Sequence, residues 1–165
     1  MDHQIYILIV EDELEVMDAI VNDLAAFEDQ FPIETANSSE EAKQVITSIY
    51  ESEQEVGLIL CDHILPGENG VELLIELSTL THTQNSKKVL VTGQAGLEDT
   101  VKAVNQADLN HYISKPWTKE QLSDVVTEQL TDYVIEHKAN LLPFMARLDG
   151  TRLSEAMRNR PLTDH

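Results

Sequence analysis

The sequence is poor in sulfur, in aromatic side chains and in positive charge. Its single cysteine, Cys61, excludes an internal disulfide and a cysteine-based zinc site. No apolar run approaches the roughly 20 residues that a membrane span needs. Residues 1 to 4 also lack the basic and apolar segments of a secretory signal. We therefore expect a cytoplasmic protein that does not contact a membrane.

The charge balance is strongly acidic, with a formal net charge of -19 over 165 residues. Binding to nucleic acid or to an anionic membrane depends on Lys and Arg meeting phosphate, so we expect no direct contact with either. The positive charge is also unevenly placed, because all four arginines follow residue 146: Arg147, Arg152, Arg158 and Arg160.

This shift in composition predicts a boundary near Asn140. We expect one domain over residues 1 to 139 and a C-terminal extension, mostly helical, over residues 140 to 165. Segments below about 40 residues rarely fold alone, so the extension is not expected to be an independent domain. Two interpretations stay open: a tail folded back on the domain, or a segment that contacts a partner or a second copy of the chain.

The apolar residues alternate between two periodicities. Short runs typical of strands buried on both faces occupy residues 5 to 10, 56 to 61, 88 to 92 and 111 to 114, and a weaker run over residues 31 to 36 would be an edge strand. Helical spacing is found over residues 14 to 27, 42 to 49, 69 to 79, 97 to 106 and 118 to 138. Ser38 with Glu41, and Thr118 with Gln121, fit the spacing of helix capping boxes. The alternation predicts an α/β fold with a doubly wound, five-stranded parallel sheet.

Charged residues follow several of these strands directly. Glu11 and Asp12 come after the first run, Asp62 after the third, and Lys115 after the fifth. In open α/β folds the chemistry lies at the carboxyl edge of the sheet, where these side chains would meet. The sequence has no glycine-rich phosphate loop or dinucleotide turn, so side chains must handle any phosphate. The pattern predicts a metal-assisted phosphoryl acceptor.

Three converging carboxylates repel one another unless a cation neutralises them. Hard oxygen ligands suit Mg²⁺, or Mn²⁺ in its place. We expect Asp12 and Asp62 to be direct ligands, and Asp62 to be the nucleophile that accepts the phosphoryl group.

The set Glu11-Asp12, Asp62 with Leu65-Pro66-Gly67, Thr92, and Tyr112 with Lys115-Pro116 resembles the receiver domain of two-component response regulators. The resemblance covers residues 4 to 138. It implies a flavodoxin-like sheet of strand order 2-1-3-4-5. It also implies that a sensor histidine kinase or a phosphotransfer protein supplies the phosphoryl group.

The resemblance further implies a role for each site residue. Glu11 would bind the metal partly through water, and the backbone carbonyl of Ile64 would be a further ligand. Lys115, with a cis peptide bond to Pro116, would pair with Asp62 and then with the phosphoryl group. Thr92 and Tyr112 would switch the surface formed by the fourth helix, fifth strand and fifth helix, which would signal to a downstream protein or form a homodimer.

Ile64 and Gln94 stand where receivers vary and where side chains influence the hydrolytic water. Because Ile64 cannot orient that water by hydrogen bonding whereas Gln94 could, we expect a moderately long-lived phosphoryl state.

Two other functions are weighed against a phosphoacceptor that catalyses only its own phosphorylation and dephosphorylation. A phosphohydrolase using Asp62 as nucleophile would need a second acid where Ile64 stands. A degenerate receiver acting only as an interaction module is disfavoured by the complete set of Asp12, Asp62, Thr92 and Lys115.

Overall fold

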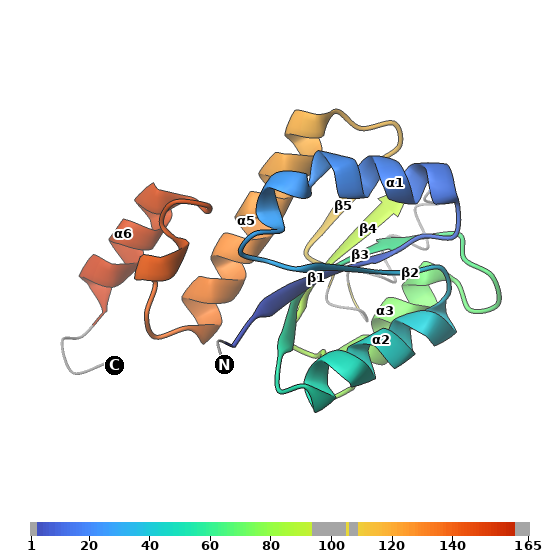
Figure 1. Ribbon diagram of the computed structural model, residues 1–165, viewed down its shortest axis with the longest axis horizontal. Helices are drawn as coiled ribbons and strands as arrows, with labels where there is room; N and C mark the ends of the chain where they lie inside the picture. Colours follow the sequence, from blue (N-terminus) through green and yellow to red (C-terminus); the bar gives the residue numbers. More distant parts are fainter. Residues whose placement is uncertain (1–2, 94–104, 106–108, 161–165) are drawn as a thin grey trace.

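The protein contains a five-stranded parallel sheet, as predicted. A computed structural model describes residues 3 to 93, 105 and 109 to 160. The strands are β1 (Ile5–Val10), β2 (Ile33–Ala36), β3 (Glu55–Asp62), β4 (Lys87–Thr92) and β5 (His111–Ser114). Their order is β2-β1-β3-β4-β5 and every neighbouring pair is parallel, which confirms the flavodoxin-like topology (Figure 1). β2 begins later than expected, because the backbone N–H of Phe31 instead donates to the carbonyl of Phe27.

Helices cover both faces of the sheet. They are α1 (Leu14–Asp23), α2 (Ser39–Glu51), α3 (Gly70–Ser78), α5 (Lys119–His137) and α6 (Gly150–Asn159), with short 3-10 turns at Ala25–Phe27 and Leu142–Phe144. α1 and α5 lie on one face, and α2 and α3 on the other (Figure 1). The helix expected over residues 97 to 106 falls, except for residue 105, outside the described residues.

The helix starts follow the capping signals with one difference. Thr118 and Gln121 form a reciprocal capping box at the start of α5. At α2 the hydroxyl of Ser38 accepts from the backbone N–H of Glu41, but the Glu41 carboxylate accepts from Asn37 rather than from Ser38. Both starts therefore form where predicted, although only the first is a complete box.

Alternation along the strands divides the core into two apolar clusters. Ile5, Ile7 and Ile9 of β1 point towards α1 and α5, whereas Leu8 and Val10 point towards α2 and α3. Burial on both faces explains why the central strands are nearly continuous apolar runs. A rigid sheet of this kind fixes the positions of the residues at its carboxyl edge.

The C-terminal extension is folded back on the domain. Leu141, Leu148 and Leu153 belong to the same buried cluster as the residues of α1 and α5. The ring of Phe144 stacks on Phe31, with 6.0 Å between centroids. α6 begins at Gly150, where the Asp149 carboxylate caps it by accepting from the backbone N–H of Arg152.

The arginines of the extension mostly contact the domain itself. Arg147 forms an ion pair with Asp29 at 2.7 Å, and Arg152 pairs with Asp132 of α5. The guanidinium of Arg160 donates to the carbonyls of Ile135 and Ala139. These contacts favour the interpretation of a tail folded back on the domain.

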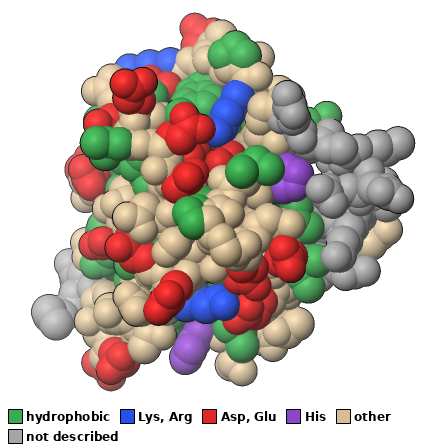
Figure 2. Space-filling model, turned by 90° about the vertical axis from the view of Figure 1, so that its right-hand side faces the viewer, with side chains coloured by type: hydrophobic (Ala, Val, Ile, Leu, Met, Phe, Trp, Pro, Cys, Tyr) green, Lys and Arg blue, Asp and Glu red, His purple; other side chains and the backbone are tan. Residues whose placement is uncertain are grey.

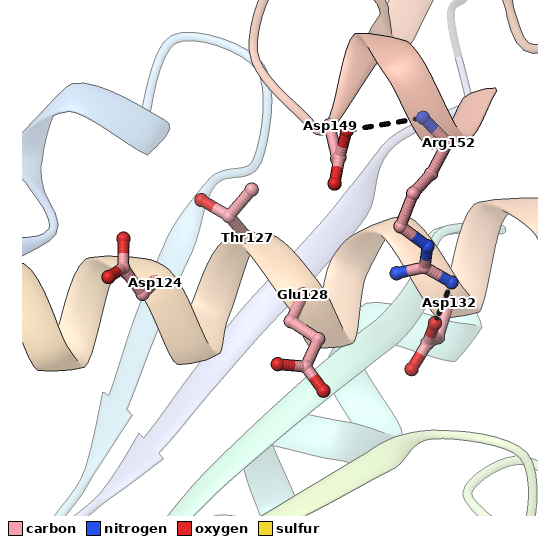
Figure 3. A pocket seen from close by; sticks show the side chains of 6 residues that line it. All are labelled: Asp124, Thr127, Glu128, Asp132, Asp149 and Arg152. Atoms are coloured by element: carbon pink, nitrogen blue, oxygen red, sulfur yellow. Dashed lines mark hydrogen bonds and ion pairs between the residues drawn. The ribbon is translucent and has the colours of Figure 1, made fainter. Parts of the chain in front are cut away.

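A hollow of about 520 Å³ lies between α5 and α6. Figure 3 shows the acidic side chains of α5 along it and Arg152 reaching across from α6 to Asp132. It is lined by Asp124, Thr127, Glu128, Asp132, Asp149 and Arg152. At this interface Leu153 of α6 is buried in the same cluster as residues of α5, and the charged and polar side chains of the hollow lie beside it.

Among the residues described, none of the helices combines the length and the apolar character of a membrane span.

We predict that Leu153→Ala lowers the free energy of unfolding by about 2 to 5 kcal/mol, because Leu153 is fully buried and truncation leaves a cavity. Glu155→Ala, at an exposed position of the same helix, should change it by no more than about 0.5 kcal/mol. Chemical denaturation of the full chain measures both. Equal stability of the two variants would mean that α6 does not contribute to the core.

Candidate functional site

The predicted site residues meet at the carboxyl edge of the sheet. Glu11 follows β1, Asp62 and Thr92 end β3 and β4, and Lys115 follows β5. Figure 2 looks onto the corresponding end of the molecule, where acidic side chains gather beside a basic one with hydrophobic side chains around them. Parallel strands thus bring residues from four distant parts of the chain to one place.

The centre of the site is a lysine between two carboxylates. The Nζ of Lys115 lies 3.0 Å from Oδ1 of Asp62 and 3.1 Å from Oε1 of Glu11. Asp12 adds a third carboxylate, and one oxygen from each of Glu11, Asp12 and Asp62 lies within 4.8 Å of the others. Three negative charges therefore face one positive charge, and a net negative charge remains.

Burial makes this imbalance costly. The side chains of Glu11 and Asp62 are only 1% and 5% exposed. Burial raises the pKa of Glu11, and hydrogen bonds from the Glu13 backbone and from Lys115 offset this only in part. Burial alone would lower the pKa of Lys115, but its hydrogen bonds to Asp62 and Glu11 outweigh that effect and raise it, so the lysine stays charged.

The carboxylates fit a divalent cation. Their oxygens are the hard ligands that Mg²⁺ prefers, and Asp12 is exposed, which leaves a side open to solvent. A cation at Glu11, Asp12 and Asp62 would neutralise the charge that Lys115 leaves uncompensated.

Asp62 is held by backbone contacts on both sides of its strand. β3 pairs with β1 and with β4, and beyond its end the His63 N–H donates to the Val91 carbonyl at 3.2 Å. The N–H of Gly70, the first residue of α3, donates to the His63 carbonyl at 2.8 Å. Asp62 therefore lies on a segment that is hydrogen-bonded to its neighbours.

Gly70 is a site-forming residue that the sequence analysis missed. A Cβ atom built there would lie 1.9 Å from the Asp62 carbonyl oxygen, so no other residue fits without moving the backbone of Asp62. Asn69 and Glu72 form an unforeseen capping box around this helix start. A glycine in the first turn of a helix expected over residues 69 to 79 was the available signal, since glycine is unfavourable inside helices.

Lys115 is placed by its own loop. Its N–H donates to the carbonyl of Thr92 at 2.9 Å, and the Lys115–Pro116 peptide bond is cis, as the resemblance led us to expect. The next residue, Trp117, donates its indole N–H to the Asp23 carboxylate at 2.9 Å.

The remaining predicted residues differ in placement. Thr92 is 4% exposed at the end of β4, and Tyr112 on β5 is 49% exposed. The Ile64 side chain is 66% exposed in the loop after Asp62, so it faces solvent instead of the core. Gln94 lies outside the described residues. Cys61 is buried, and burial raises the pKa of its thiol, so it is not a reactive thiolate.

Comparison with known proteins identifies the family. The model of the response regulator receiver domain matches residues 7 to 127. The hydrogenase transcriptional regulatory proteins HoxA of Cupriavidus necator and Bradyrhizobium diazoefficiens are 32% and 27% identical over 77% and 79% of this chain. The matched regions are 24% and 25% of those proteins, so the chain spans about a quarter of the length of these relatives.

Solved structures give the same result. A CheY-like response regulator receiver domain protein from Methanospirillum hungatei superposes with a TM-score of 0.69 at 30% identity, covering 81% of this chain and 98% of that one. The receiver domain of an HD domain-containing protein from Pseudomonas fluorescens has the same fold, with a TM-score of 0.71 at 23% identity over 79% of this chain and 98% of its own. The chain therefore belongs to the response regulator receiver domain family.

Proposed function

We propose that this receiver accepts a phosphoryl group on Asp62 and passes the change to its surface. The observation that carries the proposal is the position of the Lys115 ammonium, in contact with both Asp62 and Glu11 beside the Asp12 carboxylate. An ammonium group on a flexible side chain can pair first with a carboxylate and then with an incoming phosphoryl oxygen, so it can stabilise negative charge throughout the transfer.

The transfer breaks one bond and forms another. A carboxylate oxygen of Asp62 attacks the phosphorus of a phosphohistidine, the P–N bond breaks, and the departing imidazole nitrogen keeps the electron pair and takes up a proton. Lys115 then pairs with a phosphoryl oxygen in place of Oδ1 of Asp62. The donor is a sensor histidine kinase or a phosphotransfer protein.

Glu11, Asp12, Asp62 and the Ile64 carbonyl would hold Mg²⁺ or Mn²⁺, with Glu11 acting partly through water. When bound, the metal supplies positive charge for the phosphoryl oxygens. The grouping of the three carboxylates supports this assignment.

Thr92 and Tyr112 would carry the change to the surface. The Thr92 hydroxyl would donate to the phosphoryl group, and Tyr112 would change its rotamer at the exposed edge strand β5. The output would be contact with a downstream protein or formation of a homodimer. The net charge of -19 favours a protein partner over nucleic acid, and we place the chain in the cytoplasm.

We predict that incubation with acetyl phosphate and Mg²⁺ adds one phosphoryl group to the wild-type chain, and that Asp62→Asn abolishes the addition because the nucleophile is lost. Intact-mass spectrometry measures it. Asp18→Asn, which removes an exposed carboxylate of α1, should be labelled as wild type. Labelled Asp62→Asn protein would show that another residue is the acceptor.

We predict that EDTA stops labelling and that Asp12→Asn raises the Mg²⁺ concentration for half-maximal labelling by at least about tenfold, because one charged ligand is lost. Glu15→Gln, at an exposed position in the first turn of α1, is the matched control and should leave this concentration unchanged. A normal Mg²⁺ requirement in Asp12→Asn would remove Asp12 from the ligand set.

We predict that the label on Asp62 decays over minutes after the donor is removed, and that Ile64→Asn shortens its lifetime by offering an amide to the hydrolytic water. Leu14→Asn replaces another exposed aliphatic side chain near the site and should leave the decay unchanged. Loss of the wild-type label within seconds would contradict the expected stability.

A further inference from the structure

The loop that presents Lys115 depends on an edge strand. β5 has only four residues, and β4 is the one strand it pairs with in the described part of the chain. Of these four residues, Ile113 alone is buried. A short, exposed strand is easily displaced. The position of the Lys115 ammonium must therefore depend also on contacts that its loop makes elsewhere.

Trp117 makes such a contact. Its indole N–H donates to Oδ2 of Asp23 at 2.9 Å, and its ring packs against the cluster between the sheet and the helices α1 and α5. The contact ties the loop to the end of α1, a helix that begins three residues after Glu11. Lys115 and its carboxylate partner Glu11 are therefore linked a second time, away from the site.

Asp23 stands where a carboxylate is otherwise unfavourable. It is the last residue of α1, where the helix dipole places negative charge, and the last turn carries no basic residue. The hydrogen bond that the Asp23 carboxylate accepts from the indole of Trp117 is favourable and offsets the unfavourable interaction with the helix dipole.

We infer that Trp117 and Asp23 are positioning residues that hold the Lys115 loop against α1 so that its ammonium meets Asp62. Neither residue touches the phosphoryl group. Their effect is on how often Lys115 is placed for transfer, since small displacements of a catalytic group lower rates strongly. The inference rests on the proposed phosphorylation of Asp62.

The test uses the full chain with acetyl phosphate and Mg²⁺. Trp117→Phe keeps an aromatic ring and removes the donor, and Asp23→Ala removes the acceptor. Each should lower the rate constant for labelling at saturating acetyl phosphate by about tenfold. The concentrations of acetyl phosphate and of Mg²⁺ at half-maximal rate should not change. Asp23→Asn keeps an acceptor oxygen and should stay within about twofold of wild type.

The double variant Trp117→Phe with Asp23→Ala tests whether the two residues act through one shared contact or independently. If both residues act through one hydrogen bond, the double variant should be as slow as either single variant. Effects that multiply, or a folded Trp117→Phe variant that labels at the wild-type rate, would overturn the inference.

Fluorescence gives a readout that needs neither metal nor phosphodonor. Trp117 is the single tryptophan of the chain, so the emission reports the surroundings of this one indole, of which the Asp23 carboxylate is a part. Asp23→Ala should shift the emission, whereas Asp23→Asn should stay closer to wild type. An unchanged spectrum in Asp23→Ala would contradict the contact. If the wild-type chain is not labelled, the proposed function fails and this inference with it, whereas normal wild-type labelling with unaffected variants overturns the inference alone.

Discussion

The buried carboxylates of Glu11 and Asp62 have to be kept together against their mutual repulsion, and Lys115 is the group that does so. The sheet order makes this a long-range task. β1 and β3 are neighbours, so Glu11 and Asp62 meet directly, whereas β5 is separated from β3 by β4. The lysine side chain must therefore cross the end of β4, where the small side chain of Thr92 stands. This geometry requires a long, flexible cationic side chain after β5 and a short side chain at the end of β4, which lies between β5 and β3.

The backbone around Asp62 meets a second demand, because under the proposed function the carboxylate must be accessible and yet fixed. Its carboxylate is almost fully buried, while Ile64, two residues later, is exposed. The chain turns outward at once through Gly67, whose φ of +76° is available to glycine at little cost, and returns at Gly70 against the Asp62 carbonyl. Two glycines thus let the loop leave the sheet and come back within a few residues of Asp62.

Much of this could be predicted from the sequence, because the strands are apolar runs of distinct length and their last residues carry the charges. The strand order followed from the resemblance, and the grouping of Glu11, Asp12, Asp62 and Lys115 followed from the parallel arrangement. The contact of Trp117 with Asp23 could not be predicted, since it joins residues 94 positions apart without a periodic pattern. The path of the extension was also left open. Leu141 and Leu153 would be buried whether the extension packs on its own domain or on a partner, so their apolar character does not distinguish the two. They pack on the domain because the surface beside Phe31 and α5 is available to them.

The two ends of the sheet differ in how they treat charge. At the amino end Glu55, the first residue of β3, accepts hydrogen bonds from Lys138, Tyr133 and His3, which join α5 and the N-terminal segment to the sheet. Burial would raise the pKa of Glu55, but these partners outweigh it and lower the pKa. This carboxylate therefore stabilises the fold above its unfolded pKa and loses that effect as the pH falls through its lower folded value.

The pKa of Glu11 is shifted in the opposite direction. Because it is raised, the folded state becomes less stable as the pH rises from the unfolded pKa of this carboxyl to its higher folded value. A structure optimised only for stability would partner both carboxylates fully, as it does Glu55. The charge left uncompensated at Glu11, Asp12 and Asp62 fits a divalent cation at the carboxyl edge, whereas the carboxylate at the amino end is matched by its partners.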